Sequence, residues 1–258
     1  MRLLRELYDY RTMIASLVRR DLRGRYKGSV LGFLWTFVNP LLQFFVYTVV
    51  FSVILKNDIP RYYLFLFVAL IPFLFFSSSL TGGATAVLSQ KDMVKKIYFP
   101  REVLPISYVT TCFVNMLFCF VIVFAVVFFS GVQLDPVGLL FLPLVMAVEY
   151  LMALGIAFIT SAVTVYFRDL EHILGILAML WMYMTPVMYA PDIVPESIRP
   201  IFNLNPMTYI VNAYRDILYY GRVPDAMQLL YGFLLGLVLL TIGLLVFEKL
   251  KKHFVEEL

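Results

Sequence analysis

The chain has 258 residues, of which 62% are hydrophobic and 15% charged, and its net charge is +4. A soluble domain is about 45–50% apolar and about 25% charged, and a single core of this size could not enclose so much apolar surface. The composition therefore excludes an ordinary soluble enzyme and predicts a membrane protein. Because the basic residues flank apolar runs, they indicate contact with membrane lipids and exclude nucleic acid as a partner.

The first 27 residues form a predicted amphipathic helix. Its apolar stripe repeats at spacings of four and three: Leu3, Leu7, Tyr10, Ile14 and Leu17. Its charged face includes Arg11, Arg19, Arg20, Asp21 and Arg23. Such a helix is expected in the cytoplasmic headgroup layer. It could be a plain membrane anchor or a docking surface for a partner, and the spacing favours neither.

Six apolar stretches are long enough to cross about 30 Å of hydrocarbon, which takes about 20 helical residues. They cover 28–55, 62–90, 103–134, 136–167, 172–191 and 226–247, and their one charged residue is Glu149 in the fourth. Continuously apolar runs favour helices over a barrel. The predicted fold class is therefore an all-α integral membrane protein, with one transmembrane domain over residues 1–258.

The basic residues are shared unequally between the two sides of the membrane. Six spans place both termini on one side, where most of the 21 Lys and Arg residues fall. The other side has Lys56, Arg61, Arg199, Arg215 and Arg222. Because cytoplasmic loops are enriched in Lys and Arg, both termini are expected in the cytoplasm.

The segment 90–101 reads QKDMVKKIYFPR and is expected on the cytoplasmic face. Asp92 precedes Lys95 and Lys96 by three and four residues, the spacing of helical ion pairs. An apolar side comes from Met93, Val94 and Ile97. A short helix here could dock into another protein, whereas spacing alone slightly favours a plain basic loop, whose basic residues also include Lys91.

The segment 191–225 is expected outside the cytoplasm and is unusually apolar for a water-exposed loop. It contains five prolines and many apolar and aromatic residues. One or two short helices that dip back into the outer leaflet would account for this composition. Irregular backbone at that depth must be buried in protein or line a wet cavity, so this segment is a candidate lid on a pathway.

Residues for catalysis or cofactor binding are missing from the sequence. It contains no G-x-x-x-x-G-K-[ST] or G-x-S-x-G motif, and neither histidine has a second ligand at metal-binding spacing. Glu149 could be a polar contact in a transport path or subunit interface, but a helix–helix hydrogen bond is favoured. Cys112 and Cys119 lie too far apart on one helix to form a disulfide.

Aromatic residues are frequent in the spans. The first span carries Phe33, Phe37, Phe44 and Tyr47, and the fifth carries Trp181, Tyr183 and, at its end, Tyr189. Lipid contact and interfacial belts explain most of them. A subset could instead line a conduit in which flat rings meet sugar rings, although spacing favours lipid contact.

Five stretches resemble one known family in order and spacing. They are RGRYKGSVLGFLWTFVNPLLQ (23–43), KKIYFPREVLPI (95–106), VYFRDLEHIL (165–174), MYMTPVMYAP (182–191) and LNPMTYIVNAYRDILYYG (204–221). Together they make essentially the whole chain similar to the permease subunit of bacterial polysaccharide ABC exporters. That family exports lipid-linked O antigen, capsule or teichoic acid polymers across the bacterial inner (cytoplasmic) membrane.

The resemblance implies a complex of two permease copies with two copies of a separate ATPase, which binds ATP and magnesium. Residues 1–27 would be the interface helix, and Lys91–Ile97 a coupling helix that receives the ATPase's motion. Spans one, two and five would line the path, including Phe33, Phe37, Phe44, Tyr47, Trp181, Tyr183, Met184 and Tyr189. Re-entrant helices at the exit would include Asn205, Pro206, Tyr209, Tyr214 and Arg215.

Three alternatives stay open beside this reading. The first is an exporter of the same architecture that moves a lipid or drug. The second is a membrane enzyme acting on lipid-linked sugars, which is disfavoured because Asp169 and Glu171, two residues apart, point to different helix faces. The third is a structural membrane subunit without a pathway.

Overall fold

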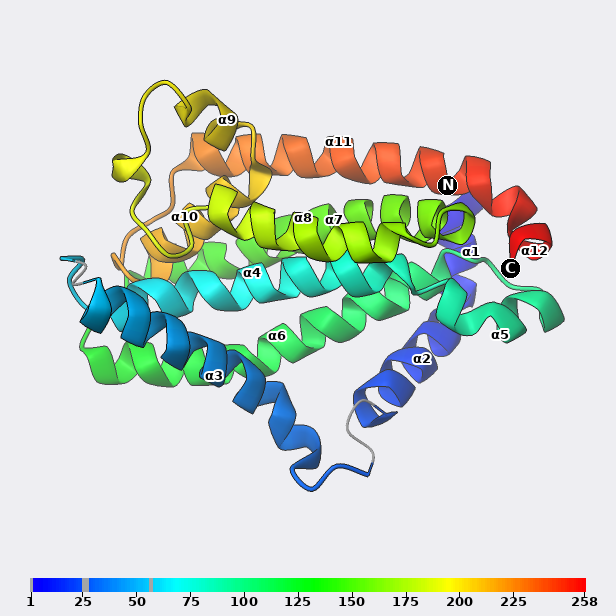
Figure 1. Cartoon of the computed structure of the whole chain (residues 1–258), viewed down its shortest axis with the longest axis horizontal. Coiled ribbons are helices and arrows are strands. Elements are labelled where there is room, and N and C mark those ends of the chain that lie inside the picture. Colours follow the sequence, from blue (N-terminus) through cyan, green and yellow to red (C-terminus); the bar gives the residue numbers. More distant parts are fainter. Residues whose placement is uncertain (1, 25–27, 56–57) are drawn as a thin grey trace.

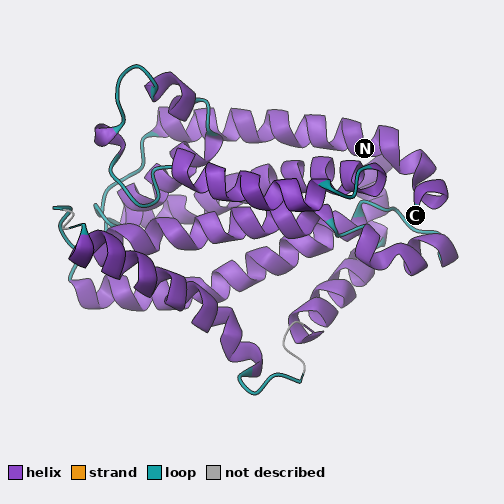
Figure 2. Cartoon of the chain, in the orientation of Figure 1, coloured by secondary structure: helices purple, strands orange, loops and turns teal. Residues whose placement is uncertain are grey.

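The computed structural model describes residues 2–24, 28–55 and 58–258, with side chains from residue 5 onward. Every regular element is helical, and the described ranges contain no strand (Figure 2). The all-α prediction is therefore confirmed. The predicted apolar stripe included Leu3, and the predicted orientation counted Arg2, Arg25, Lys27 and Lys56. The side chains of these five residues lie outside the described part of the chain.

Six helices form the bundle; most of them run along one axis, and the first of them is inclined to the rest (Figure 1). They are α3 (Trp35–Thr48, continued by a π-helical turn over Val49–Ile54), α4 (Tyr62–Ala84), α6 (Val103–Ser130), α7 (Pro136–Tyr166), α8 (Leu170–Met184) and α11 (Ala226–Leu250). All except α8 are long and apolar enough to cross a membrane. The 15 residues of α8 span about 22 Å, less than the hydrocarbon layer. Length therefore supports five spans, and the count of six stays a prediction.

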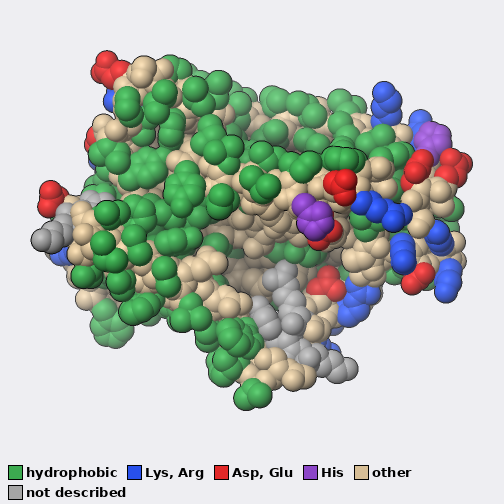
Figure 3. Space-filling view, in the orientation of Figure 1, with side chains coloured by type: hydrophobic (Ala, Val, Ile, Leu, Met, Phe, Trp, Pro, Cys, Tyr) green, Lys and Arg blue, Asp and Glu red, His purple; other side chains and the backbone are tan. Residues whose placement is uncertain are grey.

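Short elements cover both ends of the bundle. The end that holds both termini carries α1 (Arg2–Asp9), α2 (Arg11–Gly24), α5 (Lys91–Lys96) and α12 (Phe254–Glu257), and we call it the terminal end. The opposite end carries α9 (Arg199–Asn203) and α10 (Pro206–Leu218). Single 3-10 turns cover Gly32–Leu34, Leu88–Gln90, Pro191–Ile193 and Lys251–His253. Figure 3 shows charged side chains gathered mainly at the terminal end, with an apolar surface over the middle of the bundle.

Local hydrogen bonds start several of these helices. The Asp135 carboxylate accepts from the backbone N–H groups of Val137 (3.1 Å) and Gly138 (3.4 Å), and Pro136 occupies the first turn of α7. Asp225 caps α11 in the same way, accepting from the Met227 N–H at 2.8 Å. Such side chains satisfy N–H groups that have no partner inside the helix, which is why the apolar runs become helical at these residues.

The centre of the bundle is α4. All side chains from Leu64 to Leu70 are buried, and α4 contacts α3, α6, α7, α8 and α10. A helix that is apolar on every side must be enclosed by other apolar groups. The main hydrophobic cluster accordingly surrounds α4.

The closest helix pair is α7 with α11, which pack along much of their length. A Cβ added to Gly155 of α7 would lie 2.5 Å from the Leu240 nitrogen, and one added to Gly243 of α11 would overlap the Gly155 carbonyl. Small residues let two membrane helices bring their backbones together. The two glycines therefore set the distance between α7 and α11.

The described part of the N-terminal stripe faces the protein itself. Leu17 is buried, and Leu7, Tyr10 and Ile14 are partly buried against a second hydrophobic cluster at the terminal end. This cluster, which we call the terminal cluster, has as its largest members Phe99, Phe158, Phe247 and Phe254. Placement of α1 and α2 in the headgroup layer stays a prediction.

Candidate functional site

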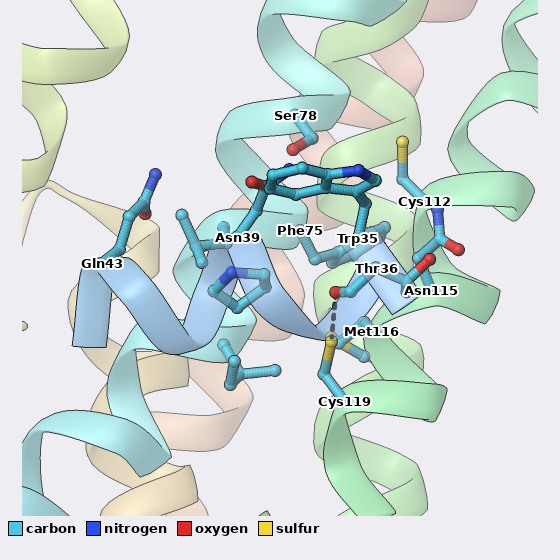
Figure 4. A pocket seen from close by; sticks show the side chains of 13 residues that line it. Trp35, Thr36, Asn39, Gln43, Phe75, Ser78, Cys112, Asn115, Met116 and Cys119 are labelled. Carbon is cyan, nitrogen blue, oxygen red and sulfur yellow. Dashed lines mark hydrogen bonds between the residues drawn. The ribbon is translucent and has the colours of Figure 1, made fainter. Parts of the chain in front are cut away.

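A cavity of about 200 Å³ lies inside the bundle, between α3, α4 and α6. Figure 4 shows Trp35 and Asn39 entering from α3, Ser78 from α4, and Cys112 and Asn115 from α6. Because α3 is apolar but only Thr36 among its residues is buried, the cavity forms where an outlying helix meets the core. The cavity therefore borders the face of α3 that is turned toward α4 and α6.

Three side-chain amides line this cavity. Asn39 and Gln43 come from α3, and Asn115 comes from α6. No hydrogen bond engages these three amides within the described ranges. Amides offer both donors and acceptors, so the cavity can bind hydroxyl groups of a ligand.

The sequence analysis missed these amides, although a signal was present. Trp35, Asn39 and Gln43 recur every four residues, which places them on one face of α3. The Trp35 indole N–H donates to the Ser29 hydroxyl at 2.9 Å. Both cysteines of the chain also line the cavity and neither forms a disulfide; Cys119 donates to the Thr36 carbonyl at 3.5 Å.

The path aromatics predicted on α3 and just before it separate into two groups. Phe33 lies edge-on to Phe37 (ring centroids 5.6 Å apart) and to Phe118 of α6 (5.3 Å). Phe44 instead packs on Phe67 of α4, with centroids 4.7 Å apart. Tyr47 reaches α8, where its hydroxyl lies 3.8 Å from the Met182 sulfur. Successive turns of this segment thus contact three different helices.

The path residues predicted on and after α8 also point in different directions. Trp181 is half-buried against Phe76 of α4, with ring centroids 4.9 Å apart, whereas Tyr183 is exposed. The Tyr189 hydroxyl donates to the Tyr183 carbonyl at 2.6 Å. The structure therefore does not bring all eight predicted path residues into one wall within a single chain.

The side chain of Asn205 joins α8 to α10 and uses both its oxygen and its nitrogen in hydrogen bonds. Its oxygen accepts from the Met207 N–H (3.0 Å) and from the Trp181 indole (2.8 Å). Its nitrogen donates to the Met184 carbonyl (3.1 Å) and the Thr185 hydroxyl (2.8 Å). A buried amide with every donor and acceptor satisfied fixes the start of α10 firmly.

The other predicted exit residues follow along α10. Pro206 occupies its first turn and is buried, whereas Tyr209 is only partly buried and donates to the Asn203 carbonyl at 2.7 Å. Tyr214 and Arg215 are 0% and 2% exposed. The second half of α10 is therefore enclosed by the bundle, and only its first half borders the surface.

Arg215 is a buried cation held by neutral groups. Its Nη2 donates to the Val187 carbonyl at 2.7 Å, and its guanidinium carbon lies 3.6 Å from the centroid of the Phe65 ring. No carboxylate pairs with it in the described part of the chain, and its Nη1 has no partner there. The side chain thus ties α10 to α4 and to the segment after α8.

At the terminal end, α5 exposes its charged side chains and packs on the terminal cluster through its apolar ones. Val94 is buried in the terminal cluster and Met93 is partly buried beside it. All the remaining predicted coupling residues are exposed: Lys91, Asp92, Lys95, Lys96 and Ile97. Ile97 is therefore available to a partner, and it is followed by Tyr98, which is 96% exposed.

The predicted interface residues of α2 form a second exposed basic surface. Arg19, Arg20 and Arg23 line an open hollow of about 480 Å³. Arg20 forms an ion pair with Asp21 at 3.2 Å, and Arg11 donates to the Tyr8 carbonyl at 2.9 Å. Arg11, Arg19 and Arg23 are exposed, whereas Arg20 and Asp21 also line a small hollow beside Leu17 and Leu104 of the terminal cluster.

A further ion cluster at the terminal end was not predicted. Lys251 pairs with Glu102, which precedes α6, and with Glu248 of α11 at 2.7 Å. Arg101 donates to the Lys251 carbonyl. The Lys251 side chain is 25% exposed and that of Glu102 only 1%. The connection from α5 to α6 is thereby fastened to the C-terminal segment.

Comparison with known proteins gives a consistent result. A family model described as ABC-2 type transporter matches residues 12–219. The chain is similar to the O-antigen export system permease protein RfbA of Myxococcus xanthus, with 38% identity over 260 residues that cover 100% of both chains. A Klebsiella pneumoniae protein of the same name is 32% identical over 245 residues, 95% of this chain and 94% of that one. The polysialic acid transport protein KpsM of Escherichia coli is 23% identical over 244 residues, 91% and 92% of the two chains.

Proposed function

The chain belongs to the ABC-2 type transporter family, and we propose that it is the membrane-spanning permease of an ATP-driven exporter of a lipid-linked polysaccharide. One observation carries the proposal: 38% identity over the full length of a protein named as an O-antigen export permease. O antigen is favoured as cargo because the relative named for polysialic acid is only 23% identical. ATP and magnesium would be bound by a separate subunit.

The terminal end would lie in the cytoplasm, and α8 with the segment after it would complete a sixth span. The gathering of charged residues at the terminal end supports this orientation (Figure 3). The opposite end, with α9 and α10, would then face outward. In this arrangement α9 and the start of α10 are the re-entrant elements at the exit.

Two exposed surfaces at the terminal end suit the ATPase. The first is α5 with Ile97 and Tyr98, where an exposed isoleucine and tyrosine stand beside four charged side chains. The second is the basic face of α2. In a complex of two permeases with two ATPase copies, the ATPases would dock on these surfaces, and Val94 would pass displacement of α5 into the terminal cluster.

A second copy of the chain would cover the face formed by α3 and α8. Both helices expose large apolar side chains, among them Leu42, Phe45 and Val46 on α3 and Ile176, Met179 and Leu180 on α8. The polysaccharide path would lie between the two copies. Aromatic groups that face different helices within one chain could meet across this interface, and the amide-lined cavity would offer hydrogen bonds to sugar hydroxyls.

The docking role of α5 can be tested by replacing Asp92, Lys95 and Lys96 with alanine. We expect less ATPase co-purified with the permease and less polysaccharide at the cell surface, because the exposed charges of α5 are lost. A Lys249→Ala, Lys252→Ala variant is the matched control, since it removes two exposed basic residues from the same end. Normal assembly and export by the triple variant would refute the docking role, and failure of the wild-type chain to export any polysaccharide would refute the function.

A further inference from the structure

A second cavity opens at the opposite end of the bundle. It has a volume of about 350 Å³ and lies between α9, α10, α11 and the segment after α8, with no lining residue from α3, α4 or α6. Ligand pockets in proteins occupy about 300–1,000 Å³, so this cavity is large enough for a small ligand. Its polar and aromatic lining includes Asp192, Arg199, Tyr209, Asn212, Gln228 and Tyr231.

The walls of this cavity are held by hydrogen bonds between neighbouring elements. The Tyr209 hydroxyl donates to the Asn203 carbonyl at 2.7 Å, and the Thr208 hydroxyl donates to the Phe202 carbonyl at 3.1 Å. Both bonds join α10 to α9. Asn205 also ties the start of α10 to the end of α8, so side-chain hydrogen bonds hold α9, α10 and the end of α8 together around the pocket.

Two amides in the cavity have unused hydrogen-bonding groups. Asn212 lies one turn after Thr208 on α10, and Gln228 lies in the first turn of α11. Both are partly buried, and no hydrogen bond engages either side chain within the described ranges. A ligand that completes the hydrogen bonds of partly buried amides binds more tightly. Each amide offers a donor and an acceptor to a hydroxyl group.

Two tyrosine rings stand beside these amides. The rings of Tyr209 and Tyr231 have centroids 6.2 Å apart and planes inclined by 38°. Flat aromatic faces pack on the apolar faces of sugar rings, while nearby amides bond the hydroxyls. The lining carries one cation, Arg199, and one anion, Asp192, so its charge is balanced. This balance favours a neutral, hydroxyl-rich ligand over the phosphate of a lipid headgroup.

We propose that this pocket binds a saccharide unit of the exported polymer, through the amides of Asn212 and Gln228 and the rings of Tyr209 and Tyr231. The proposal rests on the proposed function, since it takes the exported polysaccharide as the source of the ligand. The pocket lies on the outward end in the proposed orientation. A unit held there would be one that has already crossed the membrane, and its binding would oppose backward sliding of the polymer.

The test uses the complete exporter in lipid nanodiscs without ATP. The probe is the set of oligosaccharides released by mild acid from the host's own surface polysaccharide, and binding is measured by equilibrium dialysis. We expect the Asn212→Ala, Gln228→Ala variant to bind at least about tenfold more weakly than wild type, because two hydrogen-bonding groups are lost. The matched control is Gln133→Ala, an exposed amide at the same end but outside the pocket, which should bind like wild type.

The outcomes separate this proposal from the proposed function. Equal binding by the double variant and wild type, or no binding by a wild-type exporter that still displays polymer on cells, would overturn the pocket alone. Displacement of the oligosaccharide by glycerophosphate would show that the pocket takes a lipid headgroup, which also overturns it. Absence of surface polymer with the wild-type chain would instead refute the function.

Discussion

The Tyr214 hydroxyl donates a 2.7 Å hydrogen bond to Oε2 of Glu149, and both side chains are completely buried. This bond joins α10 to α7 across 65 positions of sequence. Of the two interpretations of Glu149, the structure favours the helix–helix hydrogen bond. The second carboxylate oxygen, Oε1, has no partner among the described residues. Tyr214 is therefore the one described group that bonds this buried carboxyl.

Tyr214→Phe should destabilise the protein by roughly 1–3 kcal/mol, because it leaves the Glu149 carboxyl buried without its hydrogen bond. The measurement is the thermal unfolding midpoint of the purified chain in detergent. Tyr63→Phe is the control, since the hydroxyl of Tyr63 has no partner in the described ranges and its side chain is 39% exposed. A midpoint for Tyr214→Phe equal to wild type would contradict the assigned role.

Arg215→Lys should also lower stability, by an amount on the order of 1–3 kcal/mol, although the charge is kept. A lysine ammonium has no planar fork to bond the Val187 carbonyl while it stacks on the Phe65 ring. Limited proteolysis of the segment after α8 would detect the loosened contact. The same substitution at the exposed Arg61 should leave the cleavage rate unchanged, and equal rates for both variants would refute the prediction.

Lys251→Met should destabilise the terminal end by roughly 1–3 kcal/mol. Removal of one partner from a fully buried ion pair costs more, about 3–5 kcal/mol. The reduction reflects the 25% exposure of the Lys251 side chain, and the cost arises because Glu102 loses its ion pair. Proteolytic release of the last residues should become faster. The exchange Glu102→Lys, Lys251→Glu should recover part of the loss relative to Lys251→Glu alone. No recovery would show that the charge pairing is not what holds the segment.

Gly155→Ala should separate α7 from α11 and reduce the amount of folded protein in the membrane. Its new methyl group would meet the backbone of Leu240, which cannot move aside as a side chain can. Overpacking of this kind costs about 1–3 kcal/mol. Gly175→Ala is the control, because a Cβ at Gly175 would meet nothing within 4 Å. Equal yield and equal unfolding midpoints for the two variants would contradict the close approach.

The sequence alone predicted the positions of the helices well, but it did not predict which groups each helix packs against. The apolar runs indicated where the helices lie, whereas the caps Asp135 and Asp225 were recognised only in the structure. The stripe containing Leu7 and Leu17 was apolar as predicted, but periodicity could not tell lipid from the terminal cluster as its partner. Ile97 was assigned to the apolar side of α5 and is exposed, because the helix ends at Lys96 and the backbone becomes extended.

Composition and local pattern thus determined that this chain is helical and lies in a membrane. Long apolar runs must leave water, and their backbone groups then bond within each helix, so both properties depend on neighbouring residues only. The tertiary structure decided which side chains converge: Glu149 with Tyr214, Lys251 with Glu102 over 149 positions, and the amides of α3 with that of α6. These contacts depend on how whole helices pack against one another, and local periodicity does not determine that packing.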